Sequence, residues 1–172
     1  MVVPAGISLD RHENGNNGIG RGGRTAFRNQ YDKVAPNGII STVAGVGTKG
    51  SSGDGGPATL AKLSGAAAIA VDQSGNLFIA DRPSAASTIS PATDNNRIRM
   101  VNPSGVITTV AGPHAGYNGE AFPSTAAAVG GPVALASDAQ GNIYVNESST
   151  QRIRKLTPVA GPLATRRRAC CQ

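Results

Sequence analysis

The side chains with the widest chemical range in this 172-residue sequence lie in segments rich in glycine, proline and serine. They are three carboxylates, an arginine, a histidine and a tyrosine: Asp54, Arg82, Asp94, His114, Tyr117 and Glu120. Carboxylates and imidazole can bind cations or transfer protons, and arginine and tyrosine donate hydrogen bonds. Because loops on a rigid scaffold are where binding residues concentrate, we interpret these six as a candidate ligand or partner face.

Metal binding and catalysis have little support in the sequence. His114 follows Pro113, and the only other histidine is His12. Cys170 and Cys171 are adjacent, so they provide neither the spaced ligands of a metal cluster nor a disulfide framework. No Gly-x-Ser-x-Gly elbow or nucleophile–base constellation occurs. We therefore predict no catalytic residue, no metal and no cofactor.

Each candidate residue also has a structural interpretation. Asp54 precedes Gly55-Gly56 and suits a local turn, and Glu120 would do the same in the second copy of the repeat described below. Asp94 suits a turn too, Arg82 a solvated loop charge, and Tyr117 a cover for the end of a sheet. The strand arginines form a further set, expected on a solvated strand face: Arg97, Arg99, Arg152 and Arg154.

The elements that carry these residues are expected to be strands. Glycine and proline number 23 and 11, and both interrupt helices, so a helical bundle is disfavoured. The hydrophobic fraction of 39% is adequate for a folded chain, and aromatic residues make up only 3%. The core must therefore come from valine, isoleucine, leucine and alanine, which favours an all-β fold.

An internal repeat organises the chain. The segment 40–45, Ile-Ser-Thr-Val-Ala-Gly, recurs at 107–112 as Ile-Thr-Thr-Val-Ala-Gly. Further segments recur in the same order: 53–57 at 119–123, 72–76 at 138–142, and 96–101 at 151–156. The spacing falls from 66 to 55 residues before the last pair, which indicates an insertion of 11 residues within 81–96.

Each repeat is predicted to form a four-stranded antiparallel meander with strands a to d. The expected strands are 68–71, 77–80, 97–101 and 106–110, then 133–136, 143–145 and 152–156, with 31–34 and 39–43 as strands c and d of an earlier unit. Gly75 and Gly141 are expected at positive φ in the a–b turns. The aliphatic residues expected between sheets are Ile69, Val71, Ile79, Ile98, Leu135, Ile143 and Ile153.

The ordered motifs resemble NHL repeats, which build β-propellers. The family pattern is met by Ile69-Ala70-Val71-Asp72, Gly75-Asn76, Ile79-Ala80-Asp81 and Asn95-Asn96-Arg97-Ile98-Arg99. The linker 52–59 also resembles those of long-loop NHL proteins, which are often extracellular. The second copy departs at Asn146-Glu147, which replaces Ala-Asp, and at Gln151, which replaces an asparagine. The resemblance implies consecutive four-stranded blades of an incomplete β-propeller over residues 29–158.

The strand count gives between two and three blades, whereas a closed propeller needs about four or more. Two explanations compete: a fragment of a longer propeller protein, which we favour, or several copies that share one ring. Because the outermost sheets would expose apolar faces, we also expect marginal stability or self-association of the isolated chain, which sedimentation velocity would detect.

The net charge of +6 lies mainly at the ends. Residues 1–35 and 159–172 hold eight lysines and arginines against three acids. We expect 1–28, rich in glycine and arginine, and the basic segment 159–172 to be poorly ordered tails. A nucleic-acid site needs a basic patch on the folded part, so nucleic acid is disfavoured as a partner. No apolar run is long enough to span a membrane, no signal peptide is visible, and the compartment is left open.

The meander places all long connections, 46–66, 81–96 and 113–131, at one face. The resemblance implies a non-catalytic binding or scaffold module that presents this loop face to a protein or small ligand. The alternative is a fragment of a propeller enzyme, of lyase or hydrolase type, whose catalytic residues lie in missing blades. Fold alone does not decide between these classes.

Overall fold

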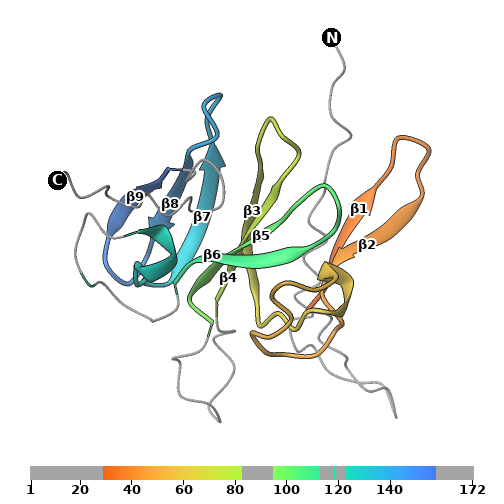
Figure 1. Cartoon of the computed structure of the whole chain (residues 1–172), viewed down its shortest axis with the longest axis horizontal. Coiled ribbons are helices and arrows are strands. Elements are labelled where there is room, and N and C mark those ends of the chain that lie inside the picture. Colours follow the sequence, from red (N-terminus) through yellow and green to blue (C-terminus); the bar gives the residue numbers. More distant parts are fainter. Residues whose placement is uncertain (1–28, 83–94, 113–117, 119–122, 158–172) are drawn as a thin grey trace, which may run out of the picture.

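A computed structural model describes residues 29–82, 95–112, 118 and 123–157. Within these residues the chain is all-β, with three antiparallel sheets of two, four and three strands that follow one another along the sequence (Figure 1). The expectations for the tails, 1–28 and 159–172, fall outside the described residues. No helix in the described part is long and apolar enough to cross a membrane.

Each sheet is a meander in sequence order, as expected from the repeat. The first contains β1 (Tyr31–Val34) and β2 (Ile40–Ala44), and the second β3 (Ala66–Val71), β4 (Leu77–Asp81), β5 (Arg97–Val101) and β6 (Ile107–Ala111). The third contains β7 (Pro132–Ser137), β8 (Ile143–Glu147) and β9 (Arg152–Leu156). Short 3-10 helices, η1 (Ala58–Leu60) and η2 (Ser124–Ala126), lie in the connections that lead to β3 and β7.

The tight a–b turns confirm the expected glycine conformations. Gly75 and Gly141 have φ values of 80° and 79°, a region that a side chain disfavours. Asp138 Oδ1 accepts hydrogen bonds from the backbone N–H groups of Gln140 and Asn142, and Asp72 organises its own turn in the same way. The Asn142 side-chain amide, first among several donors, lowers the pKa of Asp138 below its ordinary value.

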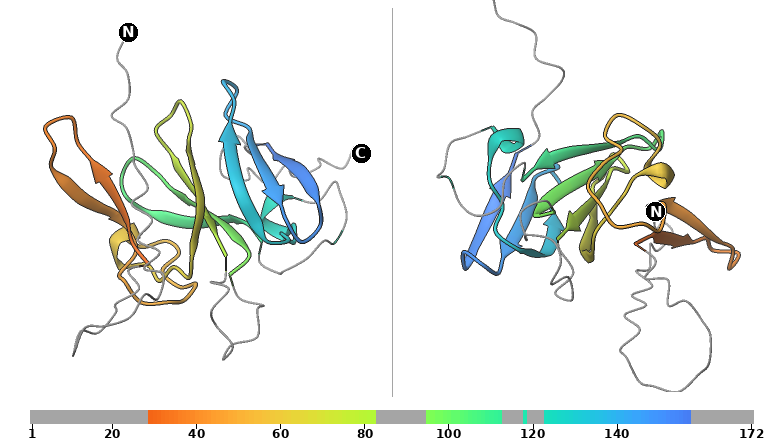
Figure 2. Two further views of the ribbon diagram at one scale, coloured as in Figure 1. Left: turned by 180° about the vertical axis from the view of Figure 1, so that it is seen from behind. Right: turned by 90° about the horizontal axis from the view of Figure 1, so that it is seen from below.

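The sheets pack face to face, and both faces of the central sheet are covered (Figure 2). One face, which includes Leu77 and Ile79, packs against β1, β2 and the linker that contains η1. The other face, which includes Phe78 and Ile98, packs against β7–β9. The strands β3 and β7 lie against each other, and the Ser137 hydroxyl donates to the Val71 carbonyl between them at 2.8 Å. This arrangement is compatible with successive blades of a propeller.

Two core expectations are wrong. Val71 was expected between sheets, but it is 37% exposed, because it is the last residue of β3 and lies next to the a–b turn. Ile153 was expected between sheets, but its side chain is 74% exposed, because β9 belongs to the last described sheet and Ile153 lies on its outer face. Its counterpart Ile98 is 0% exposed, since the third sheet covers it. Ile40, on β2 of the first sheet, is also exposed. These open faces are the kind that favour self-association, which stays a prediction.

The glycine that ends each Thr-Val-Ala-Gly segment approaches the chain of the neighbouring strand closely. A Cβ added at Gly112 would overlap the carbonyl oxygen of Asn96 and lie 2.9 Å from the Cα of Arg97. Gly45 is placed in the same way against Asn29 and Gln30. The repeated motif therefore ends in glycine because two backbone segments meet there.

We predict that Gly112→Ala lowers the free energy of unfolding by about 3 kcal/mol, because backbone atoms must move in addition to the unfavourable φ of +84°. The matched control is Gly105→Ala, whose φ is +80° but whose added Cβ would meet nothing within 4 Å. This control should lose only about 1 kcal/mol. Denaturant titration of both variants measures the difference, and equal losses would contradict the close-approach argument.

Candidate functional site

The long linker 45–65 lies at one end of the sheets, and the tight turns 35–39, 72–76 and 138–142 lie at the opposite end (Figure 1). The end of β4 and the start of β5 face the linker end. We call the end of the sheets where the linker 45–65, the end of β4 and the start of β5 lie the loop end. Of the six residues expected at a binding face, Asp54 and Arg82 lie here. The other four, Asp94, His114, Tyr117 and Glu120, lie outside the described residues.

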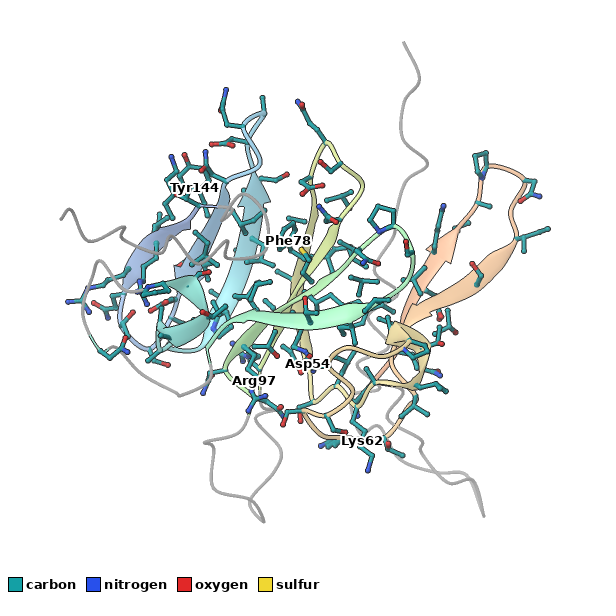
Figure 3. The ribbon with its side chains drawn as sticks, viewed as in Figure 1. Asp54, Lys62, Phe78, Arg97 and Tyr144 are labelled. Carbon is teal, nitrogen blue, oxygen red and sulfur yellow. The ribbon has the colours of Figure 1, made fainter. Side chains whose placement is uncertain are left out.

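Asp54 forms an ion pair with a buried arginine of the central sheet. Its Oδ1 atom accepts a hydrogen bond from Arg99 Nη2 at 2.7 Å, and its side chain is 44% exposed, whereas that of Arg99 is 0% exposed. The expected solvated face for Arg99 is therefore wrong, because the linker and the first sheet cover that face. The suggestion that Asp54 serves only its own turn is also incomplete, since its ion pair with Arg99 fastens the linker to β5. Figure 3 labels Asp54 on the linker.

A second carboxylate, Asp81 at the end of β4, lies fully buried beside Arg99. Its Oδ1 atom accepts hydrogen bonds from the backbone N–H groups of Ser64 (2.8 Å) and Gly65 (3.2 Å), where the linker enters β3. Its Oδ2 atom lies 4.0 Å from Arg99 Nη1. The Asn95 side-chain amide donates to the Ser64 hydroxyl, which ties the start of β5 into the same group. We call Asp54, Ser64, Asp81, Asn95 and Arg99 the polar cluster.

Burial shifts the ionisation of Asp81. It raises the pKa of Asp81 to about 6, against the opposing effects of the Ser64 and Gly65 amides and of the Arg99 and Arg97 charges. Burial also raises the pKa of Tyr31, and the negative charge of Asp81 adds to that effect. Among the described residues, the buried atoms that lack a hydrogen-bond partner include Tyr31 Oη, Asp81 Oδ2, Asn95 Oδ1 and Arg99 Nη1. This interior therefore contains both hydrogen-bond donors and acceptors that lack partners, and burying charged groups there costs free energy.

The second repeat contains an equivalent pair. Glu147 ends β8 where Asp81 ends β4, and Arg154 occupies the position of Arg99. Arg154 Nη1 donates to Glu147 Oε1 at 3.3 Å and to the Ala128 carbonyl at 2.6 Å, both in buried surroundings. The solvated strand face expected for Arg154 is therefore wrong as well. The departure from Asp to Glu keeps a carboxylate for the arginine, which identifies the pair as a feature of the repeat.

Two cationic side chains of the loop end lie nearer to solvent. Arg82 is partly exposed, and its backbone N–H donates to the Gly65 carbonyl at 3.1 Å. Lys62 is exposed on the linker (Figure 3). The described residues contain no group of three or more His, Cys, Asp or Glu side chains that could hold a metal ion. The polar cluster can therefore hold the linker in a rigid loop surface, with the cationic side chains of Lys62 and Arg82 on its outer side.

Sequence reasoning missed the polar cluster, although a signal was present. Both copies place an acid at the end of strand b and an arginine at the third position of strand c. In a four-stranded sheet covered on both faces, a charged residue at a repeated position needs a partner. Because strands b and c are neighbours, their register favours pairing of the acid on strand b with the arginine on strand c.

The fold and the site define an all-β repeat protein in which buried carboxylate–arginine pairs fasten the connections to the sheets. A solved structure with a similar fold is that of a structural genomics protein of unknown function from Bacteroides thetaiotaomicron VPI-5482, matched at a TM-score of 0.59 and 21% sequence identity. The match covers 76% of this chain and 30% of that chain, so this chain spans less than a third of that protein's length. No protein-family model and no curated protein matches the sequence.

We predict that Asp81→Asn changes how stability depends on pH. Because the folded state holds the Asp81 proton more tightly than the unfolded state, this group's contribution to stability is greatest below about pH 4 and is lost as the pH rises to about 6. The stability of the wild type relative to Asp81→Asn should therefore fall between pH 4 and pH 6 and then level off. Denaturant titrations across this range measure it.

The control is Asp138→Asn. Since the pKa of Asp138 is lowered, its contribution is complete above the ordinary aspartate pKa and is lost only as the pH falls through the lowered value. The stability difference between wild type and this control should be flat from pH 4 to 6. A flat difference for Asp81→Asn as well would refute the raised pKa.

Arg99→Met should lower the free energy of unfolding at pH 7 by about 3 to 5 kcal/mol, because it leaves Asp81 buried without its cation. The double variant Asp81→Asn with Arg99→Met should recover part of this loss, since the uncompensated charge is gone. Lys62→Met, at an exposed site of the same linker, serves as the control and should change little. A double variant no more stable than Arg99→Met alone would argue against charge as the cause.

Proposed function

We propose that the chain is part of an NHL-type β-propeller and acts as a non-catalytic binding or scaffold module that presents its loop end to a protein or ligand. The order of the repeat motifs, the meander sheets and the face-to-face packing support the propeller part of this proposal. Each sheet corresponds to one blade, in part or complete.

The observation that carries the binding part is the attachment of the linker. The Asp54–Arg99 ion pair and the Ser64 and Gly65 hydrogen bonds to Asp81 fix a long connection against two strands. A loop surface that is ordered before binding loses less conformational entropy when a partner arrives. Asp54 and Asp81 are thereby used for structure, and Lys62 and Arg82 are left toward the outside as contact residues.

The proposal predicts that partner capture depends on the loop end. The test variant reverses two charges there, Lys62→Glu with Arg82→Glu. The matched control reverses two charges near the tight turns, Lys33→Glu with Lys155→Glu. Tagged full-length chains are used to capture proteins from extract of the source cells, and the captured proteins are quantified by mass spectrometry.

We expect a set of proteins whose recovery falls at least tenfold with the loop-end variant and is unchanged with the tight-turn variant. Equal recovery with both variants, or equal loss with both, would contradict a binding role for the loop end. Circular dichroism and denaturant midpoints of all three chains confirm that folding is retained, which is expected because none of the four residues belongs to the polar cluster.

A further inference from the structure

A cavity of about 240 Å³ lies between the second and third sheets and is lined both by residues of the tight turns 72–76 and 138–142 and by η2 in the connection that leads to β7. Its walls are apolar and come from both sheets: Phe78, Met100 and Val110 on one side, and Ile143 and Leu156 on the other. Phe78 and Ile143 belong to the packed core between the sheets, and Met100, Val110 and Leu156 pack against it. The cavity is thus a continuation of the interface between sheets.

The geometry of the two sheets explains why a gap exists there. The inner strands β3 and β7 are held together by the Ser137–Val71 hydrogen bond, and the Asn96 side chain accepts a hydrogen bond from the Gly131 N–H group at the other end. The cavity extends from Phe78 of β4 and Ile143 of β8 toward the outer strands β5, β6 and β9. Sheets that radiate from a common inner edge diverge outward, so their outer strands cannot pack as closely as the inner ones.

The size and lining of the cavity indicate what would fill it. The site is partly open to solvent, since Thr125 and Thr157 on its lining are exposed and Met100, Val110 and Leu156 are half-buried. For comparison of size, an enclosed apolar cavity of about 150 Å³ already accepts benzene. A site of 240 Å³ has room for a somewhat larger molecule, of the size of a two-ring aromatic compound. A Met thioether and a Phe ring are favourable neighbours for an aromatic ring.

Polar groups occur at the margin of this apolar space. Three hydroxyl side chains line it, those of Ser124, Thr125 and Thr157. Near the tight turns the lining includes Asp72 and Asn76, and the Asn76 side-chain amide already donates a hydrogen bond to the Asp72 carboxylate at 2.7 Å. An apolar pocket with a few hydroxyl groups suits a ligand that is mainly apolar and carries one hydrogen-bonding group.

We propose that this cavity is a binding site for a small aromatic molecule with one polar group, of about the size of indole. The ring lies between Phe78 and Leu156 beside the Met100 sulfur, and its N–H or O–H group donates to a hydroxyl oxygen on η2. Neither Lys62 nor Arg82, the contact residues proposed at the loop end, lines this site, so its existence does not depend on the binding role proposed there.

The test uses the two methionines of the chain, Met1 and Met100, as reporters. The full chain is labelled with ¹³C at the methionine methyl groups and titrated with indole. We expect the Met100 resonance to shift through the ring current of the ligand, with a dissociation constant on the order of 0.1 mM, while Met1 serves as the internal reference. Cyclohexanol, a non-aromatic molecule of comparable bulk, should bind at least tenfold more weakly.

Two variants fill the cavity from different elements: Val110→Phe from β6 and Ser124→Leu from η2. Each should weaken indole binding at least tenfold, and the dispersion of the spectrum reports whether the variant is folded. Ile153→Phe adds a ring on the exposed face of the third sheet and should leave binding unchanged. The proposal is overturned if Met100 does not respond to several millimolar indole, if both folded variants bind as well as wild type, or if cyclohexanol binds equally.

Discussion

The burial of the central sheet on both faces is the constraint on which the rest of the structure depends. Every residue of β4 is buried, and alternate side chains enter different cores, Leu77 and Ile79 in one and Phe78 and Ala80 in the other. A strand in this position has no solvated side on which to place polar groups. Each charged residue of the sheet must therefore find a partner inside the protein or at the end of the strand.

Asp81 and Arg99 satisfy this requirement in a way that also positions a loop. The carboxylate of Asp81 accepts two backbone N–H groups at the end of the linker, and the guanidinium of Arg99 reaches Asp54 in its middle. Buried ion pairs contribute little net stability compared with apolar residues, but the loss of one partner is strongly unfavourable. The pair therefore specifies where the linker lies more than it strengthens the sheet.

The sequence was sufficient to predict the strands, their order and the a–b turns, because these depend on local patterns. Residues 31–34, 97–101 and 152–156 form strands with the predicted bounds, and Gly75 and Gly141 have the positive φ that their turns need. The environment of each side chain was harder to predict. Alternation in β5 separates Arg99 from Ile98 but does not reveal that both faces are covered, so the arginine was assigned to solvent.

The candidate site was only partly predictable for the same reason. Asp54 was identified as a residue of interest, yet its partner lies 45 positions away in a strand whose register is known only from the folded sheet. Ile98 and Ile153 show the limit most clearly: they hold the same position in the repeat, but one is 0% and the other 74% exposed. The local sequence determines that both residues lie in a strand, whereas the presence or absence of a following sheet determines whether the side chain is buried.

The two carboxylate–arginine pairs differ in a way that follows from side-chain length. Asp81 is short, so its carboxylate stays near the backbone of β4, meets the amides of Ser64 and Gly65, and remains 4.0 Å from Arg99. Glu147 has one more methylene and reaches Arg154 at 3.3 Å, while its other oxygen accepts from the Thr150 hydroxyl at 2.7 Å. The shorter acid thus binds the incoming linker, and the longer one binds the arginine and the turn that follows its own strand. A substitution that preserves the charge at a repeated position can in this way change which segment of chain is held in place.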